Sequence, residues 1–445
     1  MKRSKRVVLS SVCVVLVLSV ACLAFAGGRK EETKEGKKII TFWWAGAWDV
    51  VKMPEWIDIA VKQYEAENPN IDIDPVQQSL DTLIPSFKAA AAAQEGPDIA
   101  FFWGGVWCLE DVWAGSIAPL SDYWSMDEIE QVIGYKDRLW NGKVWGVGYY
   151  LSGKPMTYNK KLFQKAGLDP EKPPKNWEQF VDVCKKLKNA GITPLGLGLK
   201  DQWQGGWMVS HWGIQDLDSP DDMKKVALGR AKLTEPKYSD WWKRLEFIIQ
   251  QGYYNDDVLS LTADQGWDLF PQQRIAMVFA TDSHVGAWVE ELGVEAVGVA
   301  RIPAMGKGKL SGSYFMETNG YSITSWSSHK EEAAEFLRWL YQEEQVNNFF
   351  KTTGTLHCSK KLDSNLIELP QLKKMWEWAN SDQTGPHLEN FFPTMLDEQG
   401  YFVAVAGMFA GQLTPEGAAE LTQTIIEKWR KENPDRLDEY EKWLE

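Results

Sequence analysis

Asn176-Trp-Glu-Gln-Phe-Val-Asp-Val-Cys-Lys-Lys-Leu-Lys-Asn-Ala-Gly191, followed directly by Ile192-Thr-Pro-Leu-Gly-Leu-Gly-Leu199, is the part of the sequence that decides the fold. Its apolar side chains recur at helical spacing, at Trp177, Phe180, Val181, Cys184 and Leu187. This spacing predicts a helix over 177–190. The short apolar run that follows predicts a buried strand, which ends in the polar and Trp-rich loop 200–207.

The ends of the predicted helix carry capping signals. Asn176 can accept a hydrogen bond from the first turn, and Gln179 stands three residues later, as in a capping box. Gly191 comes directly after the last turn, where a left-handed residue is favoured. A helix followed at once by a buried strand is typical of an α/β domain.

The same alternation of strands and helices occurs near the start of the chain. We expect strands at 38–43, 71–76 and 96–102, and helices at about 54–67 and 80–95. Further on, 274–280 and 294–303 read as strands, and 330–341 reads as a helix. The pattern predicts a mostly parallel sheet covered by helices.

Several motifs resemble the family 1 extracellular solute-binding proteins, the sugar-capturing subunits of bacterial ABC importers, which include maltose-binding protein. They are Tyr158-Asn-Lys-Lys-Leu-Phe163, Ala166-Gly-Leu-Asp-Pro170, Pro173-Pro-Lys-Asn-Trp-Glu-Gln-Phe180, Gly96-Pro-Asp-Ile99 and the tail 411–419. The resemblance implies an α/β type II periplasmic-binding-protein fold, with two α/β lobes, a ligand cleft between them and several hinge crossings. These crossings are expected near 149–154, 300–304 and 354–360.

Both lobes are expected to be discontinuous in sequence. We expect the N-terminal lobe to comprise 38–150 and 304–354, and the C-terminal lobe 151–303 and 355–445. A charged segment without apolar residues, 27–37, is expected to be a disordered leader.

Residues 1–26 have the features of a signal peptide. A basic start precedes an apolar run, and Ala24-Phe-Ala26 fits a cleavage site before Gly27. The alternative is lipidation at Cys22, although Ser19 stands where such sites prefer leucine. We therefore expect an exported, periplasmic protein, with a lipid anchor at Cys22 as the alternative.

The charge of the chain excludes some partners. Without residues 1–26, 44 Lys and Arg face 62 Asp and Glu, a net charge of −18, which argues against nucleic acid or an anionic membrane as partner. The chain shows no catalytic or phosphate-binding motif, and its five histidines lack metal-ligand spacing. We expect no catalytic residue, no metal and no cofactor, and a monomer.

The 24 tryptophans are the strongest functional signal. A half-exposed aromatic ring suits the apolar face of a sugar, whose hydroxyl edge needs polar partners. Most tryptophans are expected to be core, but four follow predicted strands in Gly-rich loops, where ligands bind in open α/β sheets. With polar residues nearby, they form the predicted ligand site: Trp44, Gln78, Trp103, Asp201, Trp203, Gln204, Trp207, Asp282, His284, Asn319 and His357.

The resemblance bears on two parts of this site. Asp201 and Trp203 fall where the family often has an acidic residue and an aromatic ring in the second lobe. Asp282 to His284 fall on the matching ligand-side loop, and His284 stands where relatives often have a tryptophan. The sequence thus favours a substrate-binding component of an ABC importer, which captures a monosaccharide or short oligosaccharide by hinge closure and delivers it to membrane permease subunits. The alternatives are an exported carbohydrate-active hydrolase with two carboxylates, or a binding protein for a polyol or another polar solute.

Overall fold

The computed structural model describes residues 36–381 and 383–444. The predicted signal peptide, Cys22 and most of the predicted leader lie outside the described residues. Within the described ranges, no helix combines the length and the apolar character needed to cross a membrane.

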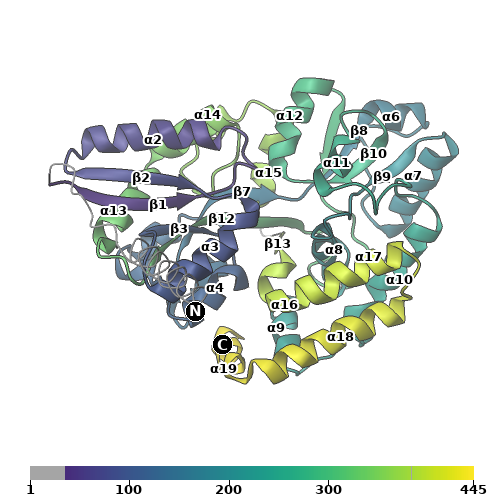
Figure 1. The fold of residues 1–445 in the computed structure, drawn as a ribbon. Helices are drawn as coiled ribbons and strands as arrows, with labels where there is room; N and C mark the ends of the chain where they lie inside the picture. Colours follow the sequence, from purple (N-terminus) through teal and green to yellow (C-terminus); the bar gives the residue numbers. More distant parts are fainter. Residues whose placement is uncertain (1–35, 382, 445) are drawn as a thin grey trace, which may run out of the picture.

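The larger of two sheets is mixed and runs in the order β13-β12-β3-β1-β2, with β4 and β7 also paired to β12. β1 pairs in parallel with β2 and β3, whereas β12 runs antiparallel to β3 and β7. Its strands are β1 (Lys38–Trp44), β2 (Ile71–Gln77), β3 (Ile99–Phe102), β4 (Ile117–Ala118), β7 (Val147–Gly153), β12 (Tyr314–Thr324) and β13 (Thr384–Pro386). We call the part of the molecule built on this sheet the first lobe (Figure 1).

The side chains of β3 alternate between the two faces of the larger sheet, and helices cover both faces. Ile99 and Phe101 belong to the core cluster that contains α2, whereas Ala100 and Phe102 belong to the cluster that contains α4 and Phe87 of α3. The helices of this lobe are α2 (Met53–Glu67), α3 (Leu80–Ala93), α4 (Val106–Trp113), α5 (Met126–Ile129), α13 (Lys330–Leu340) and α14 (Glu343–Thr353). A separate two-stranded ribbon joins β5 (Leu139–Trp140) and β6 (Lys143–Val144).

The smaller sheet runs in the order β11-β8-β10-β9 and forms the second lobe. β9 and β10 are parallel, and β8 is antiparallel to β10 and β11. The strands are β8 (Met156–Asn159), β9 (Thr193–Gly196), β10 (Ile275–Phe279) and β11 (Val297–Ala300). The predicted strands at 192–199, 274–280 and 294–303 are therefore correct in place but too long, because their ends leave the sheet.

The helices on the second-lobe side include α19, which also contacts the first lobe. They are α6 (Lys160–Lys165), α7 (Trp177–Asn189), α8 (Gln204–His211), α9 (Asp221–Ala227), α10 (Pro236–Gln250), α11 (Ala263–Asp268), α12 (Asp282–Leu292), α15 (Pro370–Ala379), α16 (Thr394–Leu396), α17 (Phe402–Phe409), α18 (Pro415–Glu432) and α19 (Pro434–Leu444).

α7 confirms the helix predicted over 177–190, with two corrections. Val183 is buried and Val181 only partly so, because the buried face is rotated slightly from the predicted one. Asn176 accepts from the Gln179 amide at 3.0 Å, but the Gln179 side chain accepts from the Lys175 amide, so no reciprocal capping box forms. Gly191 has a φ of +72°, the left-handed conformation that was predicted.

The chain passes between the two sheets several times. β7 of the larger sheet continues into β8 of the smaller one through Lys154 and Pro155, and β11 returns to β12 through 301–313. β13 pairs with β12 before the chain enters the second-lobe helices α16 to α18. Figure 1 shows the two lobes side by side, with these connections between them.

Candidate ligand-binding site

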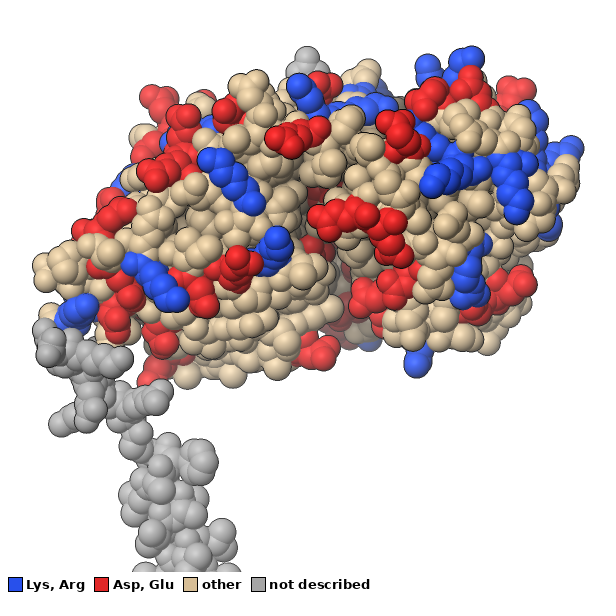
Figure 2. All heavy atoms as spheres, turned by 90° about the horizontal axis from the view of Figure 1, so that it is seen from above, with Lys and Arg blue, Asp and Glu red and all other residues tan. Residues whose placement is uncertain are grey.

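The candidate site lies between the lobes, at the ends of strands from both sheets. β1, β3, β9 and β10 each run out at their carboxyl ends into loops or helix starts that face the boundary between the lobes. Ligands of open α/β sheets bind in this position. Figure 2 shows a narrow hollow between the two halves of the molecule, with acidic side chains along it.

The second lobe contributes a wall of aromatic rings. The ring centroids of Trp203 and Trp207 lie 5.1 Å apart, and Trp267 lies 5.6 Å and 5.7 Å from these two rings. His284 follows β10 and lies 4.6 Å from Trp267. Asp201 accepts a hydrogen bond of 3.0 Å from the Trp203 indole nitrogen, which holds that ring at the end of the loop after β9.

The first lobe contributes a second aromatic wall. Trp103 directly follows β3, and its ring lies 6.2 Å from Trp48 and 5.8 Å from Trp107. Gly105 has a φ of +59°, and a Cβ there would lie 2.1 Å from the Asn390 carbonyl oxygen. Only glycine therefore lets the segment around Asn390 come this close to the start of α4.

Lys154 lies between the two walls, at the crossing from β7 to β8. Its Nζ is 2.7 Å from the Ser152 hydroxyl, 3.6 Å from the Glu317 carboxylate and 3.9 Å from the centre of the Trp207 ring. The side chain is buried, and its charge is balanced by carboxylates rather than by water. It joins the connection between the lobes to the aromatic wall of the second lobe.

Two further carboxyl groups lie close enough to Lys154 to be affected by its charge. Burial raises the pKa of Asp282 to about 7, and the Lys154 ammonium opposes this rise. Burial also raises the pKa of Asp49, against the effects of Lys154 and of the Tyr150 hydroxyl, 3.1 Å away. Both carboxyl groups therefore take up a proton more readily than usual. A carboxyl group that can gain or lose a proton can donate hydrogen bonds to a ligand hydroxyl or accept them from it.

Two histidines, His387 buried and His284 partly buried, complete the centre of the site. His387 lies 5.7 Å from Trp207, and its Nε2 is 3.2 Å from the Glu389 carboxylate. Burial lowers the pKa of His387 and of His284 to about 4, so both rings are neutral at neutral pH. A neutral imidazole offers one donor and one acceptor to a ligand.

Several buried polar atoms near the site have no protein partner among the described residues. Both side-chain oxygens of Asp282 and both amide atoms of Asn319 and Asn390 have no hydrogen-bond partner among the described residues, and the same holds for His387 Nδ1. Buried polar groups are normally satisfied. A bound polar ligand would satisfy several of these groups at once.

The structure brings most of the predicted site residues to this boundary. They are Trp103, Asp201, Trp203, Trp207, Asp282, His284 and Asn319. Gln204 adjoins them: it lines a small cavity beside Trp207, and its oxygen accepts from the Gly198 amide at 3.3 Å.

Three predicted residues lie elsewhere. Trp44 is 5% exposed and belongs to the core of the first lobe. His357 is fully buried, with its ring between 4.7 and 5.4 Å from those of Tyr149, Tyr341 and Phe349. Gln78 is buried after β2, and its oxygen accepts a long bond of 3.5 Å from the Thr82 hydroxyl.

Sequence reasoning missed several residues of the site. Trp48 and Asp49 stand in the loop after β1, where a sequence signal was available, because this loop was already expected to be near the ligand. Lys154 lies in the expected crossing 149–154 but was not singled out, since a lysine before a proline is common. Trp267 had no such signal, since a tryptophan in a short helix is common. Within the described ranges, no three His, Cys, Asp or Glu side chains gather as a metal site requires.

Comparison with known proteins agrees with this geometry. The sequence model of the bacterial extracellular solute-binding proteins matches residues 47–347. A binding protein of Brucella abortus is 27% identical over 305 residues, 67% of this chain and 72% of that one. An ABC transporter extracellular-binding protein of Pyrococcus horikoshii is 24% identical over 362 residues, 78% of this chain and 81% of that one.

The fold also matches solved structures. One described as a chitin oligosaccharide binding protein gives a TM-score of 0.76 at 25% identity, covering 88% of this chain and 98% of that chain. The likeness confirms the predicted type II periplasmic-binding-protein fold, and the relatives named here are described as binding proteins. The chain belongs to the family of bacterial extracellular solute-binding proteins and is an extracellular solute-binding protein of the ABC-transporter type.

Proposed function

We propose that this protein captures a sugar between its two aromatic walls and delivers it to the permease subunits of an ABC importer. The observation that carries the proposal is the pairing of partly exposed rings with buried polar groups that lack partners. Trp103 stands on one side of the boundary, Trp203 and Trp207 stand on the other, and Asp282 and Asn319 lie nearby. Rings accept the C–H faces of a sugar, and the polar atoms accept or donate to its hydroxyl groups.

The charges near the site favour a neutral ligand over an anionic one. Lys154 is already paired with Glu317 at 3.6 Å, and the carboxyl groups of Asp49 and Asp282 lie nearby, so its charge is not free to pair with a phosphate or carboxylate. The same argument weakens the case for an anionic polar solute. A neutral polyol has no sugar ring, so it has no apolar ring faces that could stack on the two tryptophan walls.

Binding is coupled to closure of the lobes. A ligand that contacts both walls does so only when the lobes are together, so it shifts the population toward the closed form. The lobes are proposed to comprise 38–150 with 304–354 and 151–303 with 355–445, apart from segments 151–153 and 384–386, which pair with β12 of the first lobe. Lys154, at the first crossing, would then couple closure of the lobes to the position of the aromatic wall through its contact with the Trp207 ring.

Export and a monomeric state are part of the proposal. Cleavage after Ala26 would give a protein that begins at Gly27, whereas lipidation would leave a modified Cys22 as the first residue. Intact mass of the protein from its native host distinguishes the two, and light scattering measures its oligomeric state.

A sugar panel tests the proposed ligand. Thermal unfolding of the purified protein is measured with neutral sugars, with polyols and with sugar phosphates. A ligand present at 100 times its Kd stabilises the folded state by about 2.7 kcal/mol, which is readily detected. Stabilisation by a polyol or a sugar phosphate but by no neutral sugar would refute the proposal.

Turnover distinguishes the protein from a hydrolase. After hours with its best ligand, the protein should return that ligand unchanged while adopting a more compact form in small-angle scattering. Hydrolysis that disappears on substitution of one carboxylate would instead assign the chain to the carbohydrate-active hydrolases.

A further inference from the structure

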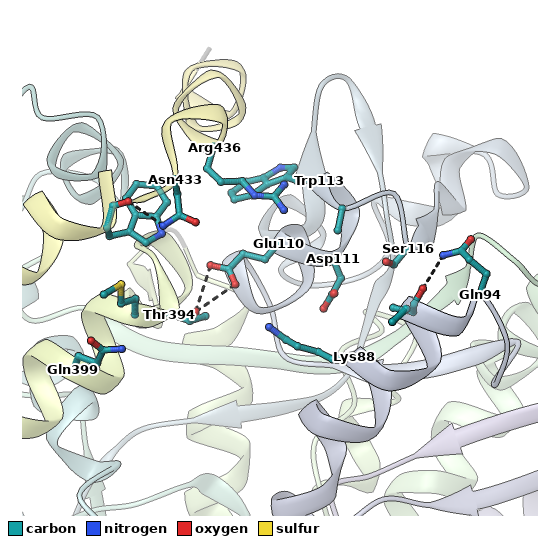
Figure 3. Close-up of a pocket in the computed structure, with 15 residues that line it drawn as sticks. Lys88, Gln94, Glu110, Asp111, Trp113, Ser116, Thr394, Gln399, Asn433 and Arg436 are labelled. Carbon is teal, nitrogen blue, oxygen red and sulfur yellow. Dashed lines mark hydrogen bonds between the residues drawn. The ribbon is translucent and has the colours of Figure 1, made fainter. Parts of the chain in front are cut away.

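A large cavity lies at one end of the boundary between the lobes. It has a volume of about 630 Å³, is open to solvent, and is lined by α3 and α4 of the first lobe and by α16, α18 and the start of α19 on the other side. Figure 3 shows its polar side chains, which come from both sides of the boundary. Those that carry the argument are Lys88, Glu110, Asp111, Gln399, Asn433 and Arg436.

The cavity adjoins the aromatic wall of the first lobe. A second cavity of about 120 Å³ is lined by Trp103 and Trp107, and it shares Lys88, Glu110 and Asp111 with the first. Trp103 is thus the point at which the proposed sugar site and this pocket meet. A ligand lying on Trp103 can therefore extend along α4 into the neighbouring cavity.

The charges of the pocket are balanced. Lys88 and Arg436 face Glu110 and Asp111 (Figure 3). Burial raises the pKa of Asp111 to about 6, and Lys88 and Arg436 oppose this rise. An anion would meet the two carboxyl groups, and a cation would meet the two basic groups, so neither suits the whole pocket.

The pocket offers hydrogen bonds of both kinds. The amides of Gln399 and Asn433 supply donors and acceptors beside the charged groups. Across the boundary, the Thr394 hydroxyl donates to the Glu110 carboxylate at 3.3 and 3.4 Å. A neutral molecule with many hydroxyl groups matches this lining. By forming hydrogen bonds to residues of both lobes, it would connect the two walls of the pocket.

We infer that the ligand is an oligosaccharide of several units, with one unit on the tryptophans at the centre and the following units in the α3–α4–α18–α19 pocket. The inference rests on the proposed function, because it extends the same sugar site. It selects between the two ligand sizes that the sequence leaves open, since a monosaccharide at the central tryptophans would leave the pocket unused.

A substitution that fills the pocket tests this inference. Ala92 lines the cavity from the exposed side of α3, so Ala92→Trp places a large ring inside it. Ala93→Trp is the matched control, because Ala93 is exposed on the same helix and does not line the cavity. Calorimetric titration is carried out with β-1,4-linked N-acetylglucosamine, β-1,4-linked xylose and α-1,4-linked glucose, each from one unit to six.

The unsubstituted protein should bind the long members of one series at least about tenfold more tightly than the short ones, which corresponds to about 1.4 kcal/mol. Ala92→Trp should remove this gain and leave the Kd of the shortest bound sugar unchanged, and Ala93→Trp should behave like the unsubstituted protein. Equal affinity for short and long sugars, or a gain with length that survives Ala92→Trp, would overturn the inference and leave the proposed function intact. Failure of every sugar to bind the unsubstituted protein would overturn both.

Discussion

Two groups of aromatic residues in the second lobe differ in how they are packed. Trp241 and Trp242 stack with ring centroids 3.7 Å apart and are 2% and 1% exposed. Trp203 and Trp207 meet edge to face at 5.1 Å, remain partly exposed, and have Lys154 over one ring. We call the first pair the core pair and the second the cleft pair.

The difference shows why the number of tryptophans says little by itself about function. The core pair sits on α10, where helical spacing turns both rings inward. The cleft pair lies at the start of α8, after the loop that follows β9, and it keeps surface that no protein atom covers. Partial exposure beside a buried charge is the feature from which we predict that a ring binds ligand rather than packs in the core.

The largest expected effect concerns the core pair. Trp241→Ala should lower the free energy of unfolding by about 3–5 kcal/mol, because truncation of a fully buried tryptophan removes apolar contacts and leaves a cavity. The protein that remains folded should bind its ligand as before. Denaturant melts without ligand and calorimetry with it measure the two quantities. A large loss of affinity at unchanged stability would show that the core pair also serves the site.

The carboxyl group beside the cleft pair gives the second prediction. The folded chain holds a proton on Asp282 between pH 3.8 and about 7, whereas the unfolded chain does not, so its contribution to stability falls as the pH rises through this range. Asp282→Asn removes that loss. We expect the free energy of unfolding to rise by up to about 4 kcal/mol at pH 8 and by less than about half of this at pH 5.

Denaturant melts of both proteins at the two pH values test this expectation. A gain of equal size at pH 5 and pH 8 would mean that the substitution acts through packing and not through the proton. A loss of stability at pH 8 would mean that Asp282 is needed in its charged form, as a partner of Lys154.

Local patterns were sufficient to predict the framework of the fold. The helix over 177–190 followed from its apolar spacing, and the first strands and helices from their alternation. The prediction of two lobes and a cleft came from the family resemblance, because pairing between strands as distant as β3 and β12 has no local signal in the sequence. Strand ends were the least accurate part, since they depend on where a partner strand stops.

The site was harder to predict, and Trp44 shows one reason. It follows Ile40 and Phe42 at every second position of β1, so it points into the same core. This alternation was visible in the sequence and favoured packing over binding. Lys154 shows the other reason, because its partners Glu317 and Trp207 come from two distant segments that only the folded chain brings to it.

The smallest expected effect concerns the cleft pair, and it completes the comparison. If the Trp203 ring stacks on the sugar, Trp203→Ala should weaken binding by about 2–4 kcal/mol, the range for a central aromatic contact, or roughly 30- to 1000-fold in Kd. The ring is partly exposed without ligand, so the free energy of unfolding should fall far less than the 3–5 kcal/mol expected of Trp241→Ala. Calorimetry and ligand-free melts again separate the two quantities. Unchanged affinity together with a large loss of stability would place Trp203 in the core and make the distinction between the two pairs wrong.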